Sequence, residues 1–562
     1  MVTESASDPV AEPYKRWSGS ETFDAIVVGS GIGGLSAAAL LAKYGQKKVL
    51  VLERHYAVGG FTHVFHRPGY EWDVGVHYLG EMQPGEFLRA VFDDLSDGQL
   101  EWADMGPVYD RAIIGDEIFD FPKGTEQLKA ALVARFPGDS AAIERYFQLV
   151  ARVRSSMPLY YMDKALPSLL SLLLGPFLRW RFLRYSDKTV RQVLEGLTGN
   201  QRLIGILTAQ CGDYGLPPSQ ASFAIHAIVA SHYFEGGFYP IGGAGRIAET
   251  IVPSIKRAGG RVLSRAEVGE IVLENGSAVG VRMQADGGII RAPIVISDAG
   301  AITTFSRLLP QAVAEPYRLE QLLRSTRPSA AHLCLYVGLK ATAAELELPK
   351  HNLWIYPDAN IDQYYSEAAD PEAAVRSLYI SFPSAKDPDF ENRCPGRATI
   401  DVIAFAAYNA FSQWEKSQWK KRPAEYEALK ERLATRMLDA LYRQVPQVRG
   451  KVDVYELSTP LTTRHFANQA RGEIYGLDHT PGRYRQRWLQ PRTPIGGLFL
   501  TGQDIVSCGV AGALMGGVIA ASAILRRNLN SAIARSARER EHLSDTRAQA
   551  LKVTASASAR GN

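Results

Sequence analysis

The sequence has few cysteines, and their spacing does not fit a covalent or metal framework. Its 562 residues include four cysteines, Cys211, Cys334, Cys394 and Cys508, and no two of them form a CxxC pair. This spacing argues against a disulfide scaffold and against a zinc site. We therefore expect a protein of a reducing compartment with no bound metal.

An excess of charge of either sign is also missing. Lys and Arg number 63 and Asp and Glu number 59, which gives a formal net charge of +4. Without a strong basic excess, nucleic acid is not the expected partner. The first residues, up to Glu21, form a polar leader that lacks the apolar core of a signal peptide, so a cytoplasmic protein is expected.

Long hydrophobic runs are scarce. Ala165–Leu178 contains fourteen uncharged residues, interrupted by proline and glycine, whereas a membrane-spanning helix needs about 20 apolar residues. Basic and aromatic residues follow this run as far as Lys188, a combination typical of membrane surfaces. We expect residues 165–188 to dock peripherally on a membrane. The alternative is a buried helix of a substrate domain.

The start of the chain predicts a β-α-β unit. Phe23–Val28 is typical of a buried strand, Gly33–Tyr44 of a helix rich in small residues, and Val49–Leu52 of a second strand. Residues 294–297 predict another short strand, and residues 497–526 repeat the order of strand, glycine turn and small-residue helix. One cofactor domain assembled from both ends of the chain and its middle is the simplest explanation.

Glycines between the first strand and helix fit a dinucleotide-binding motif. Gly29, Gly31 and Gly34 match GxGxxG, in which the glycines permit a tight turn, close approach of a pyrophosphate, and packing of helix on strand. The helix N-terminus then faces the phosphates with free N–H groups. Glu53 ends the second strand, where a carboxylate accepts hydrogen bonds from ribose hydroxyls.

Further residues favour FAD over NAD. Gly59 and Gly60 permit a second close backbone approach along a longer ligand. Asp504 follows a predicted strand and glycine turn, where it can bind a ribityl hydroxyl, and Gly509 and Gly512 open a helix that faces the flavin. The residues predicted to bind FAD are Gly29, Gly31, Ile32, Gly33, Gly34, Glu53, Arg54, Gly59, Gly60, Val268, Gly502, Asp504, Gly509 and Gly512.

The predicted fold class is α/β, with a Rossmann-type FAD-binding domain like that of glutathione reductase and an inserted α+β substrate domain. Short β-like runs recur between residues 330 and 410, and a charged helix is predicted for 423–444. The FAD-binding domain is expected at 22–85, 236–300 and 456–528, the substrate domain at 86–235 (mainly helical) and 301–455 (mainly sheet), and a flexible tail at 529–562.

Several segments carry a resemblance to a known family. They are DAIVVGSGIGGLSAAALLAKYGQKKVLVLERHYAVGG near the start, DVGVHYLGEM at 73–82, FYPIGG at 238–243, GEIYGLDH at 472–479 and LFLTGQDIVSCGVAGAL at 498–514. With these motifs the chain resembles the phytoene desaturase and carotenoid isomerase superfamily of flavoproteins. Within it, the likeness is greatest to the retinol saturase branch. Phe61 stands where desaturases usually carry Arg, which also favours the saturase branch.

The resemblance implies hydride exchange between a flavin and a carbon of a conjugated chain, so that a double bond of a polyene or other unsaturated lipid is reduced. Saturation also needs a proton for the neighbouring carbon. Tyr233 is the first candidate for its donor, followed by His226, His77 and Tyr78. The alternative is that these residues only shape an apolar tunnel.

Other functions of the same site stay open at this stage. A desaturase would run the chemistry oxidatively, an isomerase would leave the redox state unchanged, and a lipid-binding protein would hold FAD without turnover. The electron donor is open between NAD(P)H, a redox protein and a membrane carrier. No second GxGxxG occurs, and 236–237 and 242–245 are expected to lack the strand–turn–helix setting of a second Rossmann site.

Overall fold

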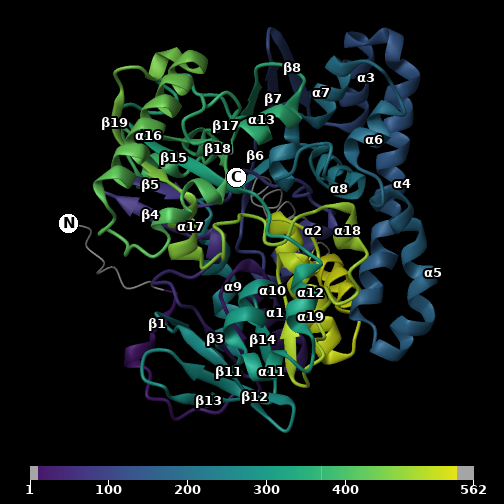
Figure 1. The fold of residues 1–562 in the computed structure, drawn as a ribbon, viewed down its shortest axis with the longest axis vertical. Coiled ribbons are helices and arrows are strands. Elements are labelled where there is room, and N and C mark those ends of the chain that lie inside the picture. Colours follow the sequence, from purple (N-terminus) through teal and green to yellow (C-terminus); the bar gives the residue numbers. More distant parts are fainter. Residues whose placement is uncertain (1–9, 369, 541–562) are drawn as a thin grey trace, which may run out of the picture.

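The structure, a computed structural model, describes residues 10–368 and 370–540, which form two halves around different sheets (Figure 1). The lower half holds a six-stranded sheet in the order β1-β10-β3-β2-β14-β20, and every neighbouring pair is parallel. Its strands are β1 (Glu12–Pro13), β2 (Ala25–Val28), β3 (Val49–Leu52), β10 (Arg261–Ser264), β14 (Val295–Ser297) and β20 (Leu498–Leu500). This is the predicted Rossmann-type sheet.

Helices bury this sheet on its faces. Four of them share one apolar core with the strands: α1 (Ile32–Gly45), α2 (Phe87–Leu95), α9 (Gly245–Arg257) and α19 (Gly509–Leu525). The strands β2 and β3 are buried at every residue, which explains their continuous runs of apolar side chains. The helix α1 ends at Gln46, a left-handed C-cap whose N–H donates to the Leu41 carbonyl.

An antiparallel sheet is appended to the Rossmann sheet. It consists of β11 (Val268–Glu274), β12 (Ser277–Met283) and β13 (Ile289–Arg291). Glycine at 280 lies between β11 and β13 and has a φ of +153°.

The upper half is built on a seven-stranded sheet in the order β19-β15-β18-β17-β16-β7-β8. All neighbours are antiparallel except β16 and β7, which run parallel. Its strands are β7 (Val108–Ile114), β8 (Glu117–Pro122), β15 (Ala331–Leu339), β16 (Asn352–Tyr356), β17 (Leu378–Ser381), β18 (Ala398–Ala406) and β19 (Val452–Ser458). The charged helix predicted for 423–444 is α16 (Ala424–Gln444), which packs its apolar face on this sheet.

A helical layer flanks the sheet on the right of Figure 1. It comprises α3 (Thr125–Arg135), α4 (Ser140–Ala165), α5 (Ser168–Ser186), α6 (Val190–Glu195), α7 (Gln201–Thr208) and α8 (Phe223–Tyr233). Two short ribbons join the halves: β4 (Val64–Arg67) with β5 (Tyr70–Asp73), and β6 (Trp102–Asp104) with β9 (Phe238–Pro240). Among the described residues no single helix is long and apolar enough to cross a membrane; one bent pair, α19 with 529–540, passes that test jointly.

Both ends of the described chain take part in the fold more than the sequence predicts. Part of the expected leader, Glu12–Pro13, pairs with β10 as an edge strand. The expected flexible tail is wrong for Leu529–Arg540, which is helical. Leu529 and Ile533 are fully buried there, because they complete the core around α1 and α19. The rest of the predicted tail lies outside the described residues.

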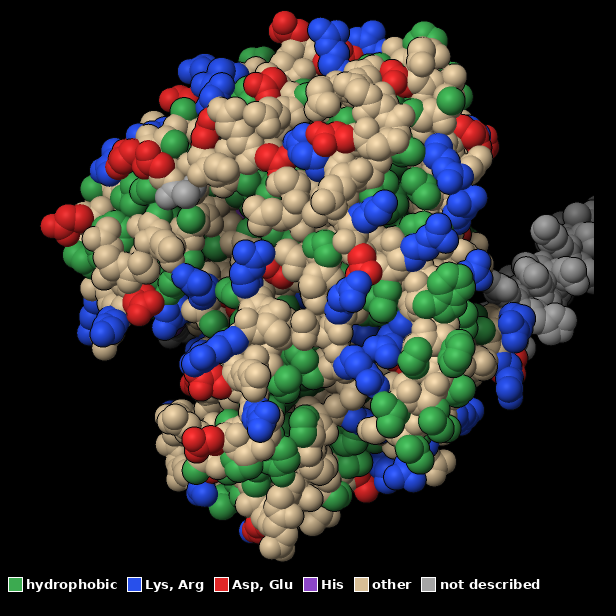
Figure 2. Space-filling view, turned by 45° about the vertical axis from the view of Figure 1, so that its right-hand side comes forward, with side chains coloured by type: hydrophobic (Ala, Val, Ile, Leu, Met, Phe, Trp, Pro, Cys, Tyr) green, Lys and Arg blue, Asp and Glu red, His purple; other side chains and the backbone are tan. Residues whose placement is uncertain are grey.

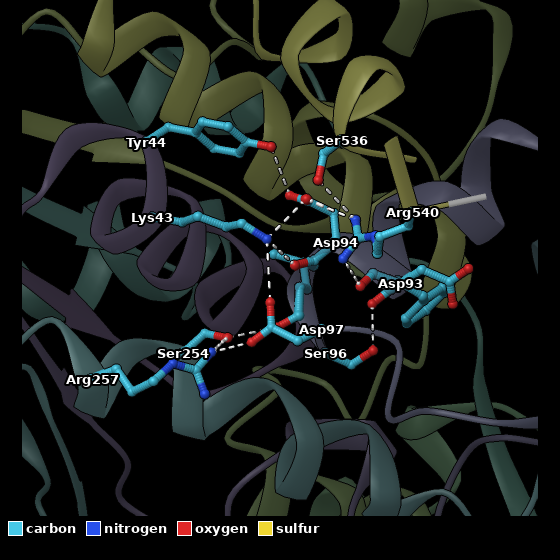
Figure 3. Close-up of polar contacts among 12 residues, drawn as sticks. Lys43, Tyr44, Asp93, Asp94, Ser96, Asp97, Ser254, Arg257, Ser536 and Arg540 are labelled. Atoms are coloured by element: carbon cyan, nitrogen blue, oxygen red, sulfur yellow. Dashed lines mark hydrogen bonds and ion pairs between the residues drawn. The ribbon is translucent and has the colours of Figure 1, made fainter. Parts of the chain in front are cut away.

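A polar cluster fastens this C-terminal helix to α1 and α2 (Figure 3). Asp94, whose side chain is fully buried, accepts hydrogen bonds from Lys43 Nζ at 2.9 Å, Tyr44 Oη at 3.0 Å and Arg540 Nη2 at 2.9 Å. A buried carboxylate is stable only with such partners. Burial, the Asp94 charge and the hydrogen bond to it raise the pKa of Tyr44 well above its usual value.

Candidate functional site

The glycine turn between β2 and α1 brings two backbone segments together. Gly29 has a φ of +99°, a conformation that favours glycine. Gly31 forms a parallel β-bridge with Gly59, and a Cβ on Gly60 would lie 2.9 Å from the Gly31 Cα. The two loops therefore approach only because side chains are absent. The arrangement places the N-terminus of α1, with the N–H groups of its first turn, at the cavity where an anionic ligand can bind.

Glu53 holds this turn from the end of β3. Its Oε2 accepts hydrogen bonds from the Ser30 backbone N at 2.9 Å and from Ser30 Oγ at 2.7 Å. Its Oε1 accepts from the His55 backbone N at 2.7 Å. Glu53 thus fixes the glycine turn, a role beyond the ribose contact predicted from the sequence.

Asp504 has a similar bracing role at the other end of the sheet. It follows β20 and Gly502, whose φ is +83°. Its Oδ2 accepts from the Ala301 backbone N at 2.7 Å, and its Oδ1 accepts from the Leu477 backbone N at 2.9 Å. The carboxylate therefore ties the segment after β14 to the GEIYGLDH segment, while it lines the same cavity as Glu53.

One cavity gathers twelve of the fourteen residues predicted to bind FAD. These twelve are Gly29, Gly31, Ile32, Gly33, Glu53, Arg54, Gly59, Gly60, Val268, Gly502, Asp504 and Gly509. Gly34 and Gly512 lie outside the lining. A Cβ on either would overlap a backbone carbonyl oxygen, that of Gly29 or Ser507, so both serve close packing at the start of a helix.

Asp298 is a cavity residue that the sequence analysis did not predict. It follows β14 directly, and a Cβ on Gly31 would lie 2.5 Å from its Oδ2. Burial, with the charges of Glu53 and Asp504, raises the pKa of Asp298 to about 8, although N–H groups of the glycine turn counteract the rise. The available signal was its place at the carboxyl end of a buried parallel strand, where ligands bind.

The opposite end of the cavity is lined mostly by rings. Trp354, Tyr356, Tyr379, Phe405 and Tyr475 line it, together with aliphatic residues of the seven-stranded sheet. A cavity with an apolar, aromatic wall and few polar groups is typical of a site for a hydrophobic small molecule. Sequence reasoning missed these residues, because an inward-facing ring on a buried strand has the same pattern as a core residue.

His77 is the one proton-donor candidate that lines the cavity. Burial lowers the pKa of His77 to about 3, so its imidazole is neutral at physiological pH. Its Nδ1 lies 3.6 Å from Asp401 Oδ2, a fully buried carboxyl.

The other three candidates lie behind the lining. Tyr78 and Tyr233 stack on each other with ring centroids 4.1 Å apart, and the Tyr78 hydroxyl lies between two carboxyl groups. His226 is buried within the helical layer, with Nε2 2.9 Å from Tyr146 Oη and Nδ1 3.3 Å from Tyr214 Oη. The structure therefore places His77 on the cavity, Tyr78 and Tyr233 behind its lining, and His226 within the helical layer.

The second glycine-rich segment lies outside the Rossmann sheet, as expected from the sequence. In local order β9, the turn at Gly242 and Gly243, and α9 do form strand, turn and helix. However, β9 pairs with β6 in an antiparallel ribbon and is not part of the parallel sheet. Among the described residues no group of His, Cys, Asp or Glu side chains is arranged to hold a metal ion, and the four cysteines are free and buried.

The predicted docking segment is an exposed helix. Of the fourteen exposed large hydrophobic side chains in the described chain, nine belong to α4 and α5. They are Leu159, Met162, Leu169, Leu170, Leu172, Leu173, Leu174, Phe177 and Trp180. Figure 2 turns this side forward and shows hydrophobic side chains grouped beside Lys and Arg.

The basic residues of α5 differ in their partners. Arg179 forms an ion pair with the buried Asp163 at 3.2 Å and donates to the Gly175 carbonyl. Arg181 and Arg184 are exposed. The helix face that packs on the molecule carries Ser171, Gly175, Phe182 and Ser186. The leucines of α5 are therefore not core residues.

Comparison with known proteins gives relatives over almost the whole chain. All-trans-retinol 13,14-reductase of Danio rerio is 38% identical, over 91% of this chain and 87% of the relative. The Homo sapiens protein of that name is 37% identical over the same shares. More distantly, chloroplastic prolycopene isomerase of Arabidopsis thaliana is 25% identical, over 84% of this chain and 78% of the relative.

A family model and solved structures agree on the fold. Residues 27–95 match the NAD(P)-binding Rossmann-like domain. Cyclohexylamine oxidase from Brevibacterium oxydans superposes with a TM-score of 0.58 at 18% identity, covering 92% of this chain and 99% of that structure. Putrescine oxidase bound to putrescine gives 0.57 at 17% identity, covering 90% and 100%. At this identity the likeness concerns the fold alone.

Proposed function

Because the chain belongs to the all-trans-retinol 13,14-reductase family, we propose that it binds FAD and reduces one carbon–carbon double bond of a retinoid-like polyene. The protein is an oxidoreductase that acts on CH–CH groups. The observation that carries the substrate class is the continuous cavity, which runs from the glycine turn at Gly31 to the rings of Trp354 and Tyr379.

The residues of the cavity fit FAD. A dinucleotide needs a close backbone approach at a helix N-terminus, and the glycines at the start of α1 carry no side chains of their own that would prevent it. Gly29 to Gly33, Gly59 and Gly60 would hold the pyrophosphate, Glu53 and Val268 the adenosine, and Gly502, Asp504 and Gly509 the flavin half. When bound, FAD supplies hydride transfer.

Substrate positioning and proton supply depend on residues of the chain. The aromatic wall aligns an elongated apolar molecule and excludes water from the reacting carbons. One cavity group must supply a proton, since a hydride alone does not complete saturation. The electron donor would be a diffusible nicotinamide, a redox protein or a membrane carrier.

The test uses the purified full chain. We expect a yellow protein with one FAD per chain, and reduced enzyme that is reoxidised without oxygen by a retinoid, which gains two hydrogens by mass spectrometry. Gly31→Val should abolish FAD retention, because its side chain would meet Asp298 and fill the pyrophosphate position. Gly138→Val is the control, since no other atom lies within 4 Å of a Cβ added at this position.

Each other product would replace the proposed reaction. A product lighter by two hydrogens would make the enzyme a desaturase, and an isomer of unchanged mass would make it an isomerase. Bound lipid without any turnover would leave a FAD-containing binding protein.

We further propose that α5 and the end of α4 dock on an anionic lipid surface. The exposed apolar side chains from Leu159 to Trp180, bordered by the exposed Arg181 and Arg184, support this partner. A lipid-soluble substrate also has to enter from an apolar phase.

The four buried free thiols support a reducing, cytoplasmic compartment.

A further inference from the structure

A hydrogen-bonded network of buried polar side chains ends at the aromatic part of the cavity. Asp213 lies in the 3₁₀ helix Ala209–Tyr214 and lines the cavity. Behind it stand Tyr78, Asp110 at the start of β7, and Asn352 at the start of β16, each less than 5% exposed. Burying such a network costs free energy unless every polar group has a hydrogen-bond partner. The donors and acceptors around each group therefore indicate where the protons lie.

The Tyr78 hydroxyl faces two carboxyl oxygens. Its Oη lies 2.8 Å from Asp110 Oδ2 and 2.9 Å from Asp213 Oδ2. A phenol has one proton, so it can donate to only one of these oxygens. The contact with the other carboxyl group is a hydrogen bond only if that carboxyl carries a proton and donates it to the phenol oxygen.

The surroundings of Asp110 decide which carboxyl is charged. Its Oδ1 accepts from Asn352 Nδ2 at 2.9 Å, and its Oδ2 also accepts from Gln210 Nε2 at 2.6 Å. Asn352 Oδ1 in turn accepts from Lys386 Nζ, at the end of α14 (Pro383–Lys386). Both oxygens of Asp110 thus accept hydrogen bonds from side-chain amides. The amine of Lys386, whose pKa burial lowers to about 7, lies one amide away.

Asp213 has no comparable support. The Tyr78 hydroxyl is the hydrogen-bond partner of its side chain among the residues that the structure describes. With Tyr78 donating to the ionised Asp110, the remaining contact requires Asp213 to be the protonated member. A neutral carboxylic acid therefore faces the cavity.

We propose that Asp213 is the acid that protonates the substrate carbon, and that Tyr78, hydrogen-bonded between the two carboxyl groups, is the positioning residue that holds its side chain in place. This assignment rests on the proposed function. A bound reduced flavin would supply the hydride for one carbon of the double bond. The Asp213 O–H bond breaks, its proton forms a C–H bond at the other carbon, and its electron pair stays on the carboxylate. After the product leaves, a proton from bulk solvent restores the acid.

Electrostatics agrees with this assignment. Burial, then the charge of Asp110, raises the pKa of Asp213 well above its ordinary value, and Tyr78 and Lys386 only moderate the rise. Burial raises the pKa of Asp110 only to about 6, because its hydrogen bonds oppose the shift. The titratable groups that face Asp213 are Asp110, Lys386, Tyr78, Cys211, Tyr214, Tyr233, Tyr356, Tyr379, Tyr475 and Cys508.

The first experiment measures the proton without any reaction. Infrared difference spectra of the apoprotein, wild type minus Asp213→Asn, should show a carboxylic acid carbonyl band at neutral pH that is lost as pH rises, while the band of neutral Asp298 is common to both proteins and cancels. Asp286→Asn, which removes an exposed carboxyl at the β12–β13 turn, should keep the band. A neutral-pH difference spectrum without that band overturns the assignment.

The second experiment follows reoxidation of the reduced holoenzyme by a retinoid under anaerobic conditions. Asp213→Asn should keep FAD and retinoid binding and slow reoxidation by about 10²–10⁴-fold, the usual contribution of one general acid. For the wild type, the rate should be constant at low pH and fall as pH rises through the pKa of Asp213, since only the protonated form reacts. That dependence should vanish in the variant, which a purely structural role would not produce.

The alternative acid is His77, which lines the same cavity. His77→Gln slowing the step while Asp213→Asn stays within about twofold of wild type would overturn our assignment in favour of the histidine. If Asp213→Asn does not fold, the pH profile of reoxidation in the wild type and in His77→Gln decides between the two acids. A wild type that reduces no polyene would overturn the proposed function and the catalytic role with it.

Discussion

Asp298 is the single residue at which binding of the cofactor and pH are coupled most directly. Its carboxyl group lies beside Gly31 and Gly33, at the N-terminus of α1 where the pyrophosphate is expected. An ionised carboxylate at this position repels phosphate, whereas a protonated one does not. The structure raises the pKa of Asp298 to about 8, chiefly through burial.

This predicts a pH-dependent affinity for FAD. Because the native pKa is above that of an unfolded chain, Asp298 is mostly neutral below about 8 and becomes charged as pH rises through that value. FAD should therefore bind more weakly above pH 8, measured by quenching of flavin fluorescence. Asp298→Asn should flatten the dependence and Asp286→Asn should not; an equally steep curve in Asp298→Asn would assign the effect elsewhere.

At the scale of elements, the pairing of α1 with α19 holds the two halves of the cofactor site together. Ser36 Oγ on α1 donates to the Leu514 carbonyl of α19 at 3.1 Å. Gly517 lies opposite, and a Cβ there would overlap Ser36 Oγ and lie 2.6 Å from the Gly33 carbonyl oxygen. The two backbones are therefore close because both helices carry small residues where they meet.

A methyl group at this contact should be enough to disturb it. Gly517→Ala should lower the midpoint of thermal unfolding, with about 1–3 kcal/mol lost from overpacking, and should weaken FAD retention because α1 moves. Gly199→Ala, where nothing lies within 4 Å of the added atom, is the matched control. Equal thermal midpoints for the two variants would show that α1 and α19 are not held at this distance.

At the scale of the whole molecule, one cavity spans both halves, and α4 and α5 expose an apolar surface on one side. The cofactor part of the cavity lies at the edge of the six-stranded sheet, and its aromatic part belongs to the seven-stranded sheet. The helical layer that carries α5 packs beside both, on one side of the molecule (Figure 1). Under the proposed docking, this side of the molecule would face the lipid.

The membrane prediction is tested by flotation with vesicles of phosphatidylcholine and phosphatidylserine. Leu172→Ser, Leu173→Ser and Phe177→Ser combined should lower binding at least about tenfold, since a buried side chain of this size contributes about 1.5 kcal/mol or more. Ile118→Ser, which changes a 59% exposed residue of β8, is the control. Unchanged flotation of the triple variant would contradict the prediction. A wild-type protein that is dimeric, with a triple variant that is monomeric, would also contradict it, since the surface would then be a dimer interface.

The exposed arginines beside this surface can be tested in the same flotation assay. Arg181→Gln with Arg184→Gln should weaken flotation only on vesicles that contain phosphatidylserine, because the attraction is electrostatic. Arg179 is left unchanged, since its ion pair with Asp163 makes it part of the fold.

Sequence alone determined the local elements, the fold class and the family. The strand predictions for the β-α-β unit and residues 294–297, and the helix at 423–444, are confirmed, because each depends on a local apolar pattern and on glycine. The family resemblance is confirmed by relatives at 37–38% identity. The role of each predicted residue toward FAD stays a prediction.

Only the tertiary structure decided which distant residues meet. Asp213, Tyr78 and Asp110 come from a 3₁₀ helix, a loop and a strand, and no periodicity relates them. Likewise, the leucines of α5 have the composition of a core helix, and only packing left them exposed. Local sequence sets backbone preference and turn geometry, whereas the charge and exposure of a side chain depend on neighbours that are far away in the chain.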